Sequence, residues 1–300
     1  RGLIMKHLLF IFNPFAGKAK IRTQLYSIIE YYKLQGYITT IYPTSNQGDG
    51  YSFISQMKEQ YDLIVCSGGD GTLNEIVSGL LDSGNDTVLG YIPSGSTNDF
   101  SKSMGISGDL NQAMEISCCG KIFNLDVGCL NNRFFVYVAG FGAFTKISYA
   151  TPQKMKNTLG YLAYLFQGIK ELSELHEYDL MIRYENGTIQ GRYIVGLVMN
   201  SFSIAGFRNP TSSLTELNDG IFEVMLVRMP QNIIELQKIV ASLMGNPLDC
   251  EYIECFQASY MEINSEPMEW TVDGEYGGKY EHTVIEIKNK AISVLVGQEN

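Results

Sequence analysis

The chain has 300 residues, 45% of them hydrophobic, and its 32 acidic and 22 basic residues give a formal net charge of −10. The length predicts two domains, and the composition excludes a disordered chain. The acidic balance disfavours a general binder of nucleic acid or of anionic membranes.

The first third of the chain alternates strand and helix patterns. Strand-like runs span residues 7–14, 37–44, 61–66 and 87–95, and helix-like runs span residues 19–36, 53–60 and 73–82. Strands that alternate with helices predict a parallel sheet covered on both faces. Ligands bind such sheets at the carboxyl ends of the strands.

From about Asp126 the pattern changes to one strand after another. Strand-like runs span residues 133–144, 178–200, 220–229, 252–263, 268–276 and 282–296, and helix-like runs span residues 154–175 and 232–245. The Asn186–Gly187 pair is a strong hairpin signal. We therefore expect an α/β plus β chain. A parallel-sheet domain covers residues 5–127 and a mostly antiparallel β-sandwich domain covers 128–285, while a final strand near 286–297 is able to return to the first domain.

The segment CSGGDGTLNEIVSGL, Cys66 to Leu80, places three glycines between a strand-like and a helix-like run. Glycines let backbone N–H groups approach an anion, and the amino end of a helix adds partial positive charge, so the segment suits phosphate binding. Asp70 needs a cation or a proton-transfer role beside phosphates. The alternative is a tight turn in which Asp70 or Thr72 caps a helix that begins near Leu73.

Two neighbouring loops favour the phosphate-binding interpretation. NPFAGKAK, from Asn13, follows the first strand, and PSGSTNDF, from Pro93, follows the fourth. Because the carboxyl ends of parallel strands share one edge of a sheet, the three glycine-containing loops predict one polyanion site.

Three motifs follow one another along the chain, and together they resemble those of the diacylglycerol kinase catalytic domain family. They are N-P-x-x-G, then G-G-D-G-T-x-N-E, then P-x-G-[ST]-x-N-D-F. That family includes bacterial diacylglycerol kinases, YegS-like proteins and sphingosine kinases. The similarity runs from Asn13 to Glu275. It implies an α/β nucleotide-binding domain like those of NAD kinases and phosphofructokinases, followed by a β-rich domain, with ATP between the two.

The resemblance also implies roles for single residues. The residues expected around ATP are Asn13, Pro14, Phe15, Ala16, Gly17, Thr44, Gly69, Asp70, Gly71, Thr72, Leu73, Asn74, Glu75 and Ser96. The family usually has threonine where this chain has Ser96, so the hydroxyl is kept. Asp70, Asp99 and Asp126 resemble aspartates that organise metal and water near the transferred phosphoryl group. Magnesium is expected because the charge on ATP oxygens calls for a hard cation held by carboxylates.

Two Asp-Gly pairs lie in the β-rich part of the chain. The segment ELNDGIFEV resembles a magnesium site of the family, made by the carbonyl of Glu216, the carboxylate of Asp219 and the carbonyl of Ile221. Spacing alone instead favours a hairpin turn at this Asp-Gly pair. In TVDGE, the resemblance implies that Asp273 or Glu275 is the general base. Asp70 is the competing candidate for the base, and Asp273–Gly274 is also a plausible turn.

For the lipid, we expect an apolar groove walled by TLGYLAYLFQGI, within a helix over residues 151–176. Lys154, Lys156 and Lys170 would meet lipid headgroups. The alternative is an amphipathic helix that packs on the sheet and leaves these lysines in solvent.

The remaining signals concern the compartment. The longest aromatic and apolar run, LGYLAYLF, is far short of the roughly 20 residues that a membrane span needs. The six cysteines lack C-x-x-C spacing and mostly sit in apolar runs, as buried reduced thiols do, and the adjacent pair Cys118 and Cys119 is interpreted as buried packing rather than redox chemistry. We expect a cytoplasmic protein, transiently peripheral to the membrane, that does not bind nucleic acid; a homodimer is left open.

The sequence as a whole predicts an ATP- and magnesium-dependent lipid kinase. It would transfer the γ-phosphoryl group of ATP to the hydroxyl of a lipid alcohol, foremost diacylglycerol, to give phosphatidic acid. One alternative is an NAD kinase, which shares G-G-D-G-T and the fold. The other is a non-catalytic sensor of nucleotide or lipid on the same scaffold.

Overall fold

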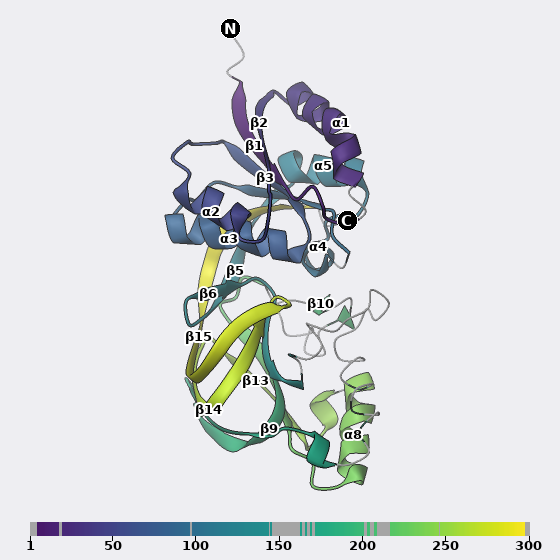
Figure 1. Cartoon of the computed structure of the whole chain (residues 1–300), viewed down its shortest axis with the longest axis vertical. Coiled ribbons are helices and arrows are strands. Elements are labelled where there is room, and N and C mark those ends of the chain that lie inside the picture. The colour runs from purple at the N-terminus through teal and green to yellow at the C-terminus, as the bar shows by residue number, and fades with distance from the viewer. Residues whose placement is uncertain are drawn as a thin grey trace. The chain divides into compact units, whose positions relative to one another are not determined.

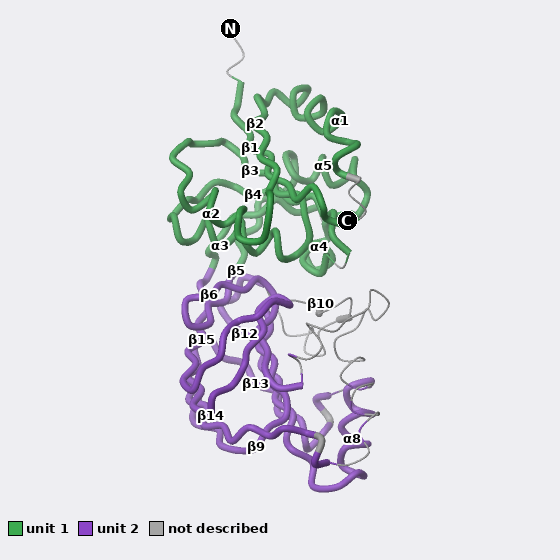
Figure 2. Tube along the Cα trace, viewed as in Figure 1, with its two compact units in different colours: residues 1–125, 290–300 green, residues 126–289 purple. Residues whose placement is uncertain are grey.

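The chain contains two compact units of structure. The computed structural model describes residues 5–17, 20–96, 98–143, 145, 163, 166, 169, 172–200, 203–204, 207–208, 217–245 and 247–297. Unit 1 comprises residues 1–125 and 290–300, and unit 2 comprises residues 126–289 (Figure 2).

Unit 1 is built around a parallel sheet. Its elements are β1 (Lys6–Phe12), α1 (Lys20–Leu34), β2 (Tyr37–Pro43), α2 (Asp49–Gln56), β3 (Leu63–Gly68), α3 (Asp70–Ser83), β4 (Leu89–Pro93), α4 (Asp99–Ser103) and α5 (Leu110–Cys119). The strand order is β4-β3-β1-β2, and every pairing is parallel. The last residues of β15 (Glu275–Val296) extend this sheet beside β4, where Val294 pairs with Leu89 in parallel.

Helices cover both faces of this sheet, as Figure 1 shows, with α1 and α5 on one side and α2 and α3 on the other. Leu8 and Phe10 of β1 pack in one core cluster with Ile28 of α1 and Met114 of α5. All five residues from Leu8 to Phe12 are buried, because a parallel strand has apolar contacts on both faces.

One helix of unit 1 lies earlier in the chain than the sequence predicts. The pattern predicts a helix over residues 53–60, whereas α2 spans Asp49–Gln56. Gly48 has a φ of +82°, which turns the chain directly into the helix, and Met57 is extended and ends it. Polar residues in the first turn of α2 hide this start from a pattern based on apolar spacing.

Unit 2 is mainly antiparallel. Its strands within the described ranges are β5 (Lys121–Leu130, entering from unit 1), β6 (Arg133–Phe135), β7 (Val138–Gly142), β8 (Tyr178–Tyr184), β9 (Gly187–Met199), β10 (Ser203–Ile204), β11 (Phe207–Arg208), β12 (Phe222–Arg228), β13 (Ile253–Ala258), β14 (Tyr260–Val272) and most of β15. The helices whose bounds are described there are η1 (Leu172–Glu174), α8 (Ile233–Met244) and η2 (Pro247–Asp249). The strands β7 and β8 each pair with both β9 and β14, so these four strands form a closed circuit.

The closed circuit of strands surrounds a core of large side chains. Trp270 of β14 lies edge-on against Phe141 of β7, with ring centroids 5.1 Å apart, and both belong to one buried cluster. The β8–β9 hairpin is found as predicted, with Tyr184 pairing with Gly187. Its two turn residues are therefore Glu185 and Asn186, one position before the Asn-Gly pair.

The predicted helix over residues 232–245 is found as α8, and its start is capped on both sides. The Asn232 side chain accepts a hydrogen bond from the Glu235 N–H, and the Glu235 carboxylate accepts from the Gln231 N–H at 2.7 Å. The other predicted helix, over residues 154–175, falls almost entirely outside the described residues, and so do Lys154, Lys156 and Lys170. In the part of the chain that is described, no helix is long and apolar enough to cross a membrane.

Candidate active site

The three glycine-containing loops of unit 1 meet at the carboxyl edge of its sheet. The amide of Asn13, in the loop after β1, lies 3.4 Å from the hydroxyl of Thr72, in the first turn of α3. In the loop after β4, the N–H groups of Ser94 and Gly95 donate to the carbonyl of Gly68 at 2.9 and 3.1 Å. The predicted convergence of the three loops is therefore present within one unit.

Two glycines make this close approach possible. Gly17 has a φ of +55°, and a Cβ there would lie 2.4 Å from the backbone oxygen of Ser94. A Cβ at Gly95 would lie 2.5 Å from the Cα of Gly69. Both distances are too short for a side chain, so the loops can pack in this way only because these positions are glycine.

The start of α3 presents backbone N–H groups rather than a side-chain cap. The helix begins at Asp70, three residues before the predicted Leu73, and Gly69 precedes it in an extended conformation without a capping hydrogen bond. The alternative in which Asp70 or Thr72 caps a later helix is therefore wrong. Uncapped N–H groups and the positive end of the helix dipole are what a phosphate group requires.

Asp70 and Asp99 form a carboxylate pair beside these loops. The Asp70 carboxylate accepts hydrogen bonds from the N–H groups of Asp99 at 3.1 Å and Phe100 at 3.2 Å, so it caps the start of α4. Burial raises the pKa of Asp70, the negative charge of Asp99 raises it further, and the Phe100 N–H opposes both effects. Asp99 is only 3% exposed, and Lys102 lies 3.1 Å from its Oδ1. Two neighbouring carboxylates such as Asp70 and Asp99 offer the oxygen ligands that Mg²⁺ prefers.

Thr44 and Leu73 are buried parts of the same region. The Thr44 N–H donates to the carbonyl of Phe12 at 2.9 Å, which ties the end of β2 to the end of β1. Leu73 is 1% exposed and faces the interior of unit 1. In contrast, Phe15 and Ser96 are exposed at the loops, and Phe15 leaves 70% of its surface accessible.

In unit 2, Asp126 holds the Asp219–Gly220 turn. The Asp126 carboxylate accepts a hydrogen bond from the Gly220 N–H at 2.6 Å, and the Asp219 carboxylate accepts from the Ile221 N–H at 3.0 Å. Gly220 has a φ of +80°, so the segment before β12 is a turn. Glu216 lies outside the described residues. Within the described ranges, no three or more His, Cys, Asp or Glu side chains gather as a metal site.

Asp273 and Gly274 form the two-residue turn between β14 and β15. Val272 pairs with Glu275 across this turn, and positive φ values of 47° and 88° at Asp273 and Gly274 match a type I′ hairpin. Glu275 is exposed at the first position of β15. The turn therefore separates the two carboxylates that a continuous strand would place on one side.

The carboxylate of Asp273 is bound by backbone from a distant part of the chain. Asp273 is 5% exposed, and its oxygens accept N–H hydrogen bonds from Val136 at 2.7 Å, Tyr137 at 3.1 Å and Val138 at 3.0 Å. The Tyr137 hydroxyl also donates to the Asp273 carbonyl at 2.9 Å. These contacts fix the β6–β7 connection, and no sequence signal reveals a partner 136 residues away.

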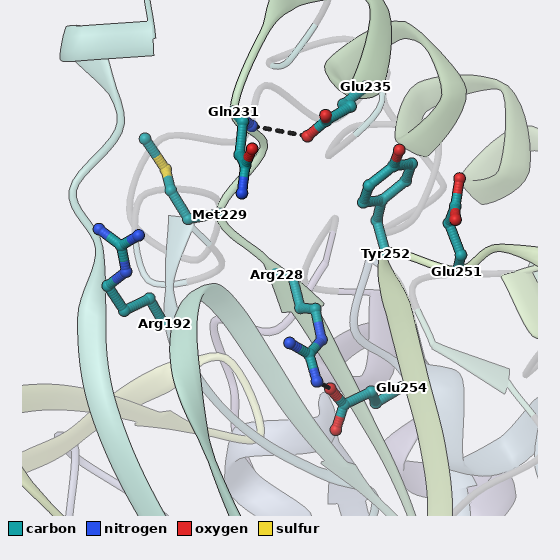
Figure 3. A pocket seen from close by; sticks show the side chains of 8 residues that line it. All are labelled: Arg192, Arg228, Met229, Gln231, Glu235, Glu251, Tyr252 and Glu254. Carbon is teal, nitrogen blue, oxygen red and sulfur yellow. Dashed lines mark hydrogen bonds and ion pairs between the residues drawn. The ribbon is translucent and has the colours of Figure 1, made fainter.

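The described residues of unit 2 line two cavities of note. One has a volume of about 420 Å³ and combines apolar walls at Leu175, Tyr178 and Ile194 with the charges of Glu269 and Lys279. The other, of about 500 Å³, is polar and is drawn in Figure 3.

The polar cavity in Figure 3 holds charges that are already paired within the protein. Arg228 forms an ion pair with Glu254, and Arg192 lies 3.2 Å from Glu177. Glu235, on the opposite wall, caps the start of α8 through Gln231. Both arginines of the cavity are thus already paired with carboxylates of the protein, which disfavours binding of the phosphates of a nucleotide there.

Comparison with known proteins agrees with the geometry of the loops. Residues 7–130 match the diacylglycerol kinase catalytic domain family. A diacylglycerol kinase of Bacillus subtilis (strain 168) is 34% identical over 280 residues, which cover 91% of this chain and 91% of that protein. The chain belongs to the diacylglycerol kinase family. The resemblance inferred from the three loop motifs is confirmed.

Further relatives give the same result. A diacylglycerol kinase of Staphylococcus haemolyticus (strain JCSC1435) is 33% identical over 281 residues, covering 93% of this chain and 84% of that protein. The crystal structure of a diacylglycerol kinase from Bacillus anthracis str. Sterne superposes with a TM-score of 0.80 over 98% of both chains, at 21% identity. The superposition on the crystal structure supports the fold of this member of the diacylglycerol kinase family.

One motif residue of this diacylglycerol kinase family member has a partner that the motif does not reveal. Glu75, on α3, accepts hydrogen bonds from the N–H groups of Gly48 at 2.7 Å and Gly50 at 3.1 Å. Its carboxylate therefore holds the turn that leads into α2. A positioning role for Glu75 follows from these two bonds, whereas the expected contact with ATP stays a prediction.

We expect Glu75→Gln to lower the free energy of unfolding of unit 1 by about 1.5–3 kcal/mol, because hydrogen bonds to a charged acceptor contribute about that much. The amide keeps only one acceptor oxygen for two donors. Denaturant unfolding measures the change, and Glu59→Gln, at an exposed position after α2, is the matched control with an expected change within about 0.5 kcal/mol. Equal stability of the two variants would show that the Glu75 contacts contribute nothing.

Proposed function

We propose that the protein is an ATP-dependent lipid kinase that phosphorylates the hydroxyl of a lipid alcohol, foremost diacylglycerol, to give phosphatidic acid. The observation that carries the proposal is the meeting of three glycine-containing loops at one sheet edge, in a chain that is 34% identical to a diacylglycerol kinase over 91% of its length. Parallel sheets bind their ligands at that edge.

Unit 1 is proposed to bind ATP. The loop of residues 13–17, Thr44, residues 69–75 and Ser96 would surround the nucleotide, and backbone N–H groups at the start of α3 would receive the phosphates. The close packing at Gly17 and Gly95 supports this proposal, because the lack of a side chain at these two positions lets the loop backbones approach each other.

Magnesium is proposed at oxygen ligands of both units. Asp70 and Asp99 in unit 1 are two adjacent carboxylates with limited access to solvent. Burial and the negative charge of Asp99 raise the pKa of Asp70. In unit 2, Asp219 and the carbonyl of Ile221 would act with Glu216, and Asp126 would hold their turn. Bound magnesium would neutralise charge that develops on the phosphate oxygens.

We propose Glu275 as the general base. Asp273 has both oxygens engaged by three backbone N–H groups, which supports a positioning role for that residue. Glu275 is exposed on the adjoining strand and would remove the proton of the acceptor hydroxyl, which is a weak nucleophile until then. Asp70 is the competitor, because burial raises the pKa of its carboxyl and makes it a better proton acceptor.

Unit 2 is proposed to hold the lipid. The cavity of about 420 Å³ has apolar walls for an acyl chain, and Lys279 lies at the same cavity. A lipid alcohol resides in a membrane, so the protein is expected to bind membranes transiently. The net charge of −10 opposes tight binding to anionic surfaces, and salt-resistant co-sedimentation with anionic vesicles would contradict this picture.

The experiment that tests the function is transfer of radiolabelled phosphate from ATP to a panel of acceptors: diacylglycerol, sphingosine, ceramide, phosphatidylglycerol and NAD. Labelling of diacylglycerol is the expected result. Labelling of NAD alone would establish the alternative NAD kinase, which shares the G-G-D-G-T motif. Nucleotide binding without turnover on any acceptor would establish a sensor.

A further inference from the structure

The adjacent pair Cys118 and Cys119 is more accessible than its sequence suggests. Cys119 is exposed, so the expectation of buried packing is wrong for this residue, whereas Cys118 is half-buried and packs against the core of unit 1. Neighbouring residues of a helix point about 100° apart. At the last turn of α5 the two sulfur atoms nevertheless lie 3.4 Å from each other.

The pair is held in place by its surroundings. The Cys118 thiol donates to the carbonyl of Met114 at 3.4 Å, and the Cys119 thiol lies 3.9 Å from the side-chain oxygen of Gln35. Burial raises the pKa of Cys118 to about 12, and Cys119 beside it adds to the rise. Cys118 is therefore a neutral thiol at pH 7, and its sulfur faces the sulfur of the exposed Cys119.

The position of the pair separates it from the proposed nucleotide loops. Gln35 lies two residues before β2, and the carbonyl of the next residue, Gly36, accepts a hydrogen bond from the N–H of Lys6, the first residue of β1. The contact with Gln35 thus puts the thiols at the amino edge of the parallel sheet of unit 1. The glycine-containing loops lie at the carboxyl edge of the same sheet.

We propose that Cys118 and Cys119 form a dithiol site for a trivalent, thiophilic metalloid, of which a monosubstituted trivalent arsenical is the chemical type. Such a centre is pyramidal, and two sulfurs on one side of it complete its coordination. The reaction with an arsenic(III) oxide forms two As–S bonds and breaks the As–O bond. Both thiol protons leave with the oxygen as one water molecule, and nothing is oxidised or reduced.

Other thiol chemistry fits this geometry less well. A linear two-coordinate ion with metal–sulfur bonds of about 2.3 Å needs its sulfurs about 4.6 Å apart. Structural zinc needs four ligands, and the described residues provide no third His, Cys, Asp or Glu at this place. A disulfide usually joins Cα atoms about 4.4–6.8 Å apart, whereas adjacent Cα atoms are about 3.8 Å apart.

The test is a titration of the folded, fully reduced protein with phenylarsine oxide, followed by intact mass measurement. We expect one equivalent to bind, with a mass increase of one phenylarsenic group less two protons. Excess glutathione should leave the adduct intact, and 2,3-dimercaptopropanol should remove it. Because a second attachment within one molecule commonly adds 10²–10⁴ in affinity, Cys118→Ser and Cys119→Ser should each weaken binding at least about 100-fold.

Cys255→Ser is the matched control, since Cys255 is a partly buried free thiol in unit 2. This variant should bind one equivalent as the parent does. The proposal is overturned if the parent forms no stoichiometric adduct, if glutathione strips it, or if both single variants of the pair keep it. Circular dichroism of the two variants would show that loss of binding is not loss of folding.

Discussion

Glu275→Gln is expected to lower turnover about 100- to 10,000-fold, because removal of a general base has this effect while ground-state binding is little changed. Glu275 is exposed at the first residue of β15, and the free energy of unfolding of the variant shows whether lost turnover is instead lost folding. Steady-state kinetics with diacylglycerol, ATP titration and denaturant unfolding measure the three quantities.

Asp273→Asn is the informative companion, since it changes the other carboxylate of the same turn. Its amide would direct an NH₂ group at one of the three N–H donors that now share the carboxylate. We expect about 1–3 kcal/mol of lost stability in unit 2, because a buried donor is left without an acceptor.

The pair of variants discriminates between the candidates for the base. Near-normal turnover of both variants would exclude Glu275 and Asp273 and make Asp70 the leading choice. A stable but inactive Asp273→Asn would instead favour Asp273 and contradict its positioning role. Loss of activity in Asp273→Asn with parallel loss of folding would leave Glu275 as the base.

Local pattern was sufficient for β1 to β4 and the helices between them, whereas it predicted neither α4 nor α5. Apolar spacing over residues 19–36 predicts α1, and the uninterrupted run from Leu63 to Cys66 predicts a strand buried on both faces, which is how β3 lies. The alternation of such runs with helices then predicts a parallel sheet, and in a parallel sheet the loops after the strands lie at the same edge.

The second half of the chain shows where local pattern fails. The sequence predicts separate strands over 268–276 and 282–296, whereas β15 is one strand from Glu275 to Val296. Gly277 and Gly278 suggest a break, but the register shifts between Trp270 and Thr271, so these glycines lie at a bulge within the ladder. Glycine marks both a turn and a bulge, and only the partner strand decides between them.

The site residues divide in the same way. A glycine in a motif indicates that another backbone segment packs closely against it, as Ser94 packs against Gly17. A carboxylate in a motif indicates only that some hydrogen-bond donor or cation lies nearby, and not which one. Asp273 and Glu75 both bind backbone N–H groups far away in sequence, and neither motif identifies these partners.

The substitution Gly17→Ala is expected to disrupt the loops of unit 1, with a loss in kcat/KM for ATP of about 100-fold, the effect typical of a 1 Å misplacement. The added Cβ would lie 2.4 Å from the backbone oxygen of Ser94, and a backbone atom cannot yield as the end of a flexible side chain can. The loop after β1, the loop after β4, or both must therefore move.

Gly105→Ala separates this effect from backbone strain. Gly105 has a φ of +63°, close to the +55° of Gly17, but a Cβ there meets nothing within 4 Å. Both variants bear the cost of alanine in the left-handed region, about 1–2 kcal/mol, and only Gly17→Ala adds the collision. If the two variants show the same kinetics with ATP, convergence of the loops does not matter for the nucleotide. A loss confined to Gly17→Ala, with both proteins folded, would tie ATP use to the meeting of the loops at the carboxyl edge of the sheet.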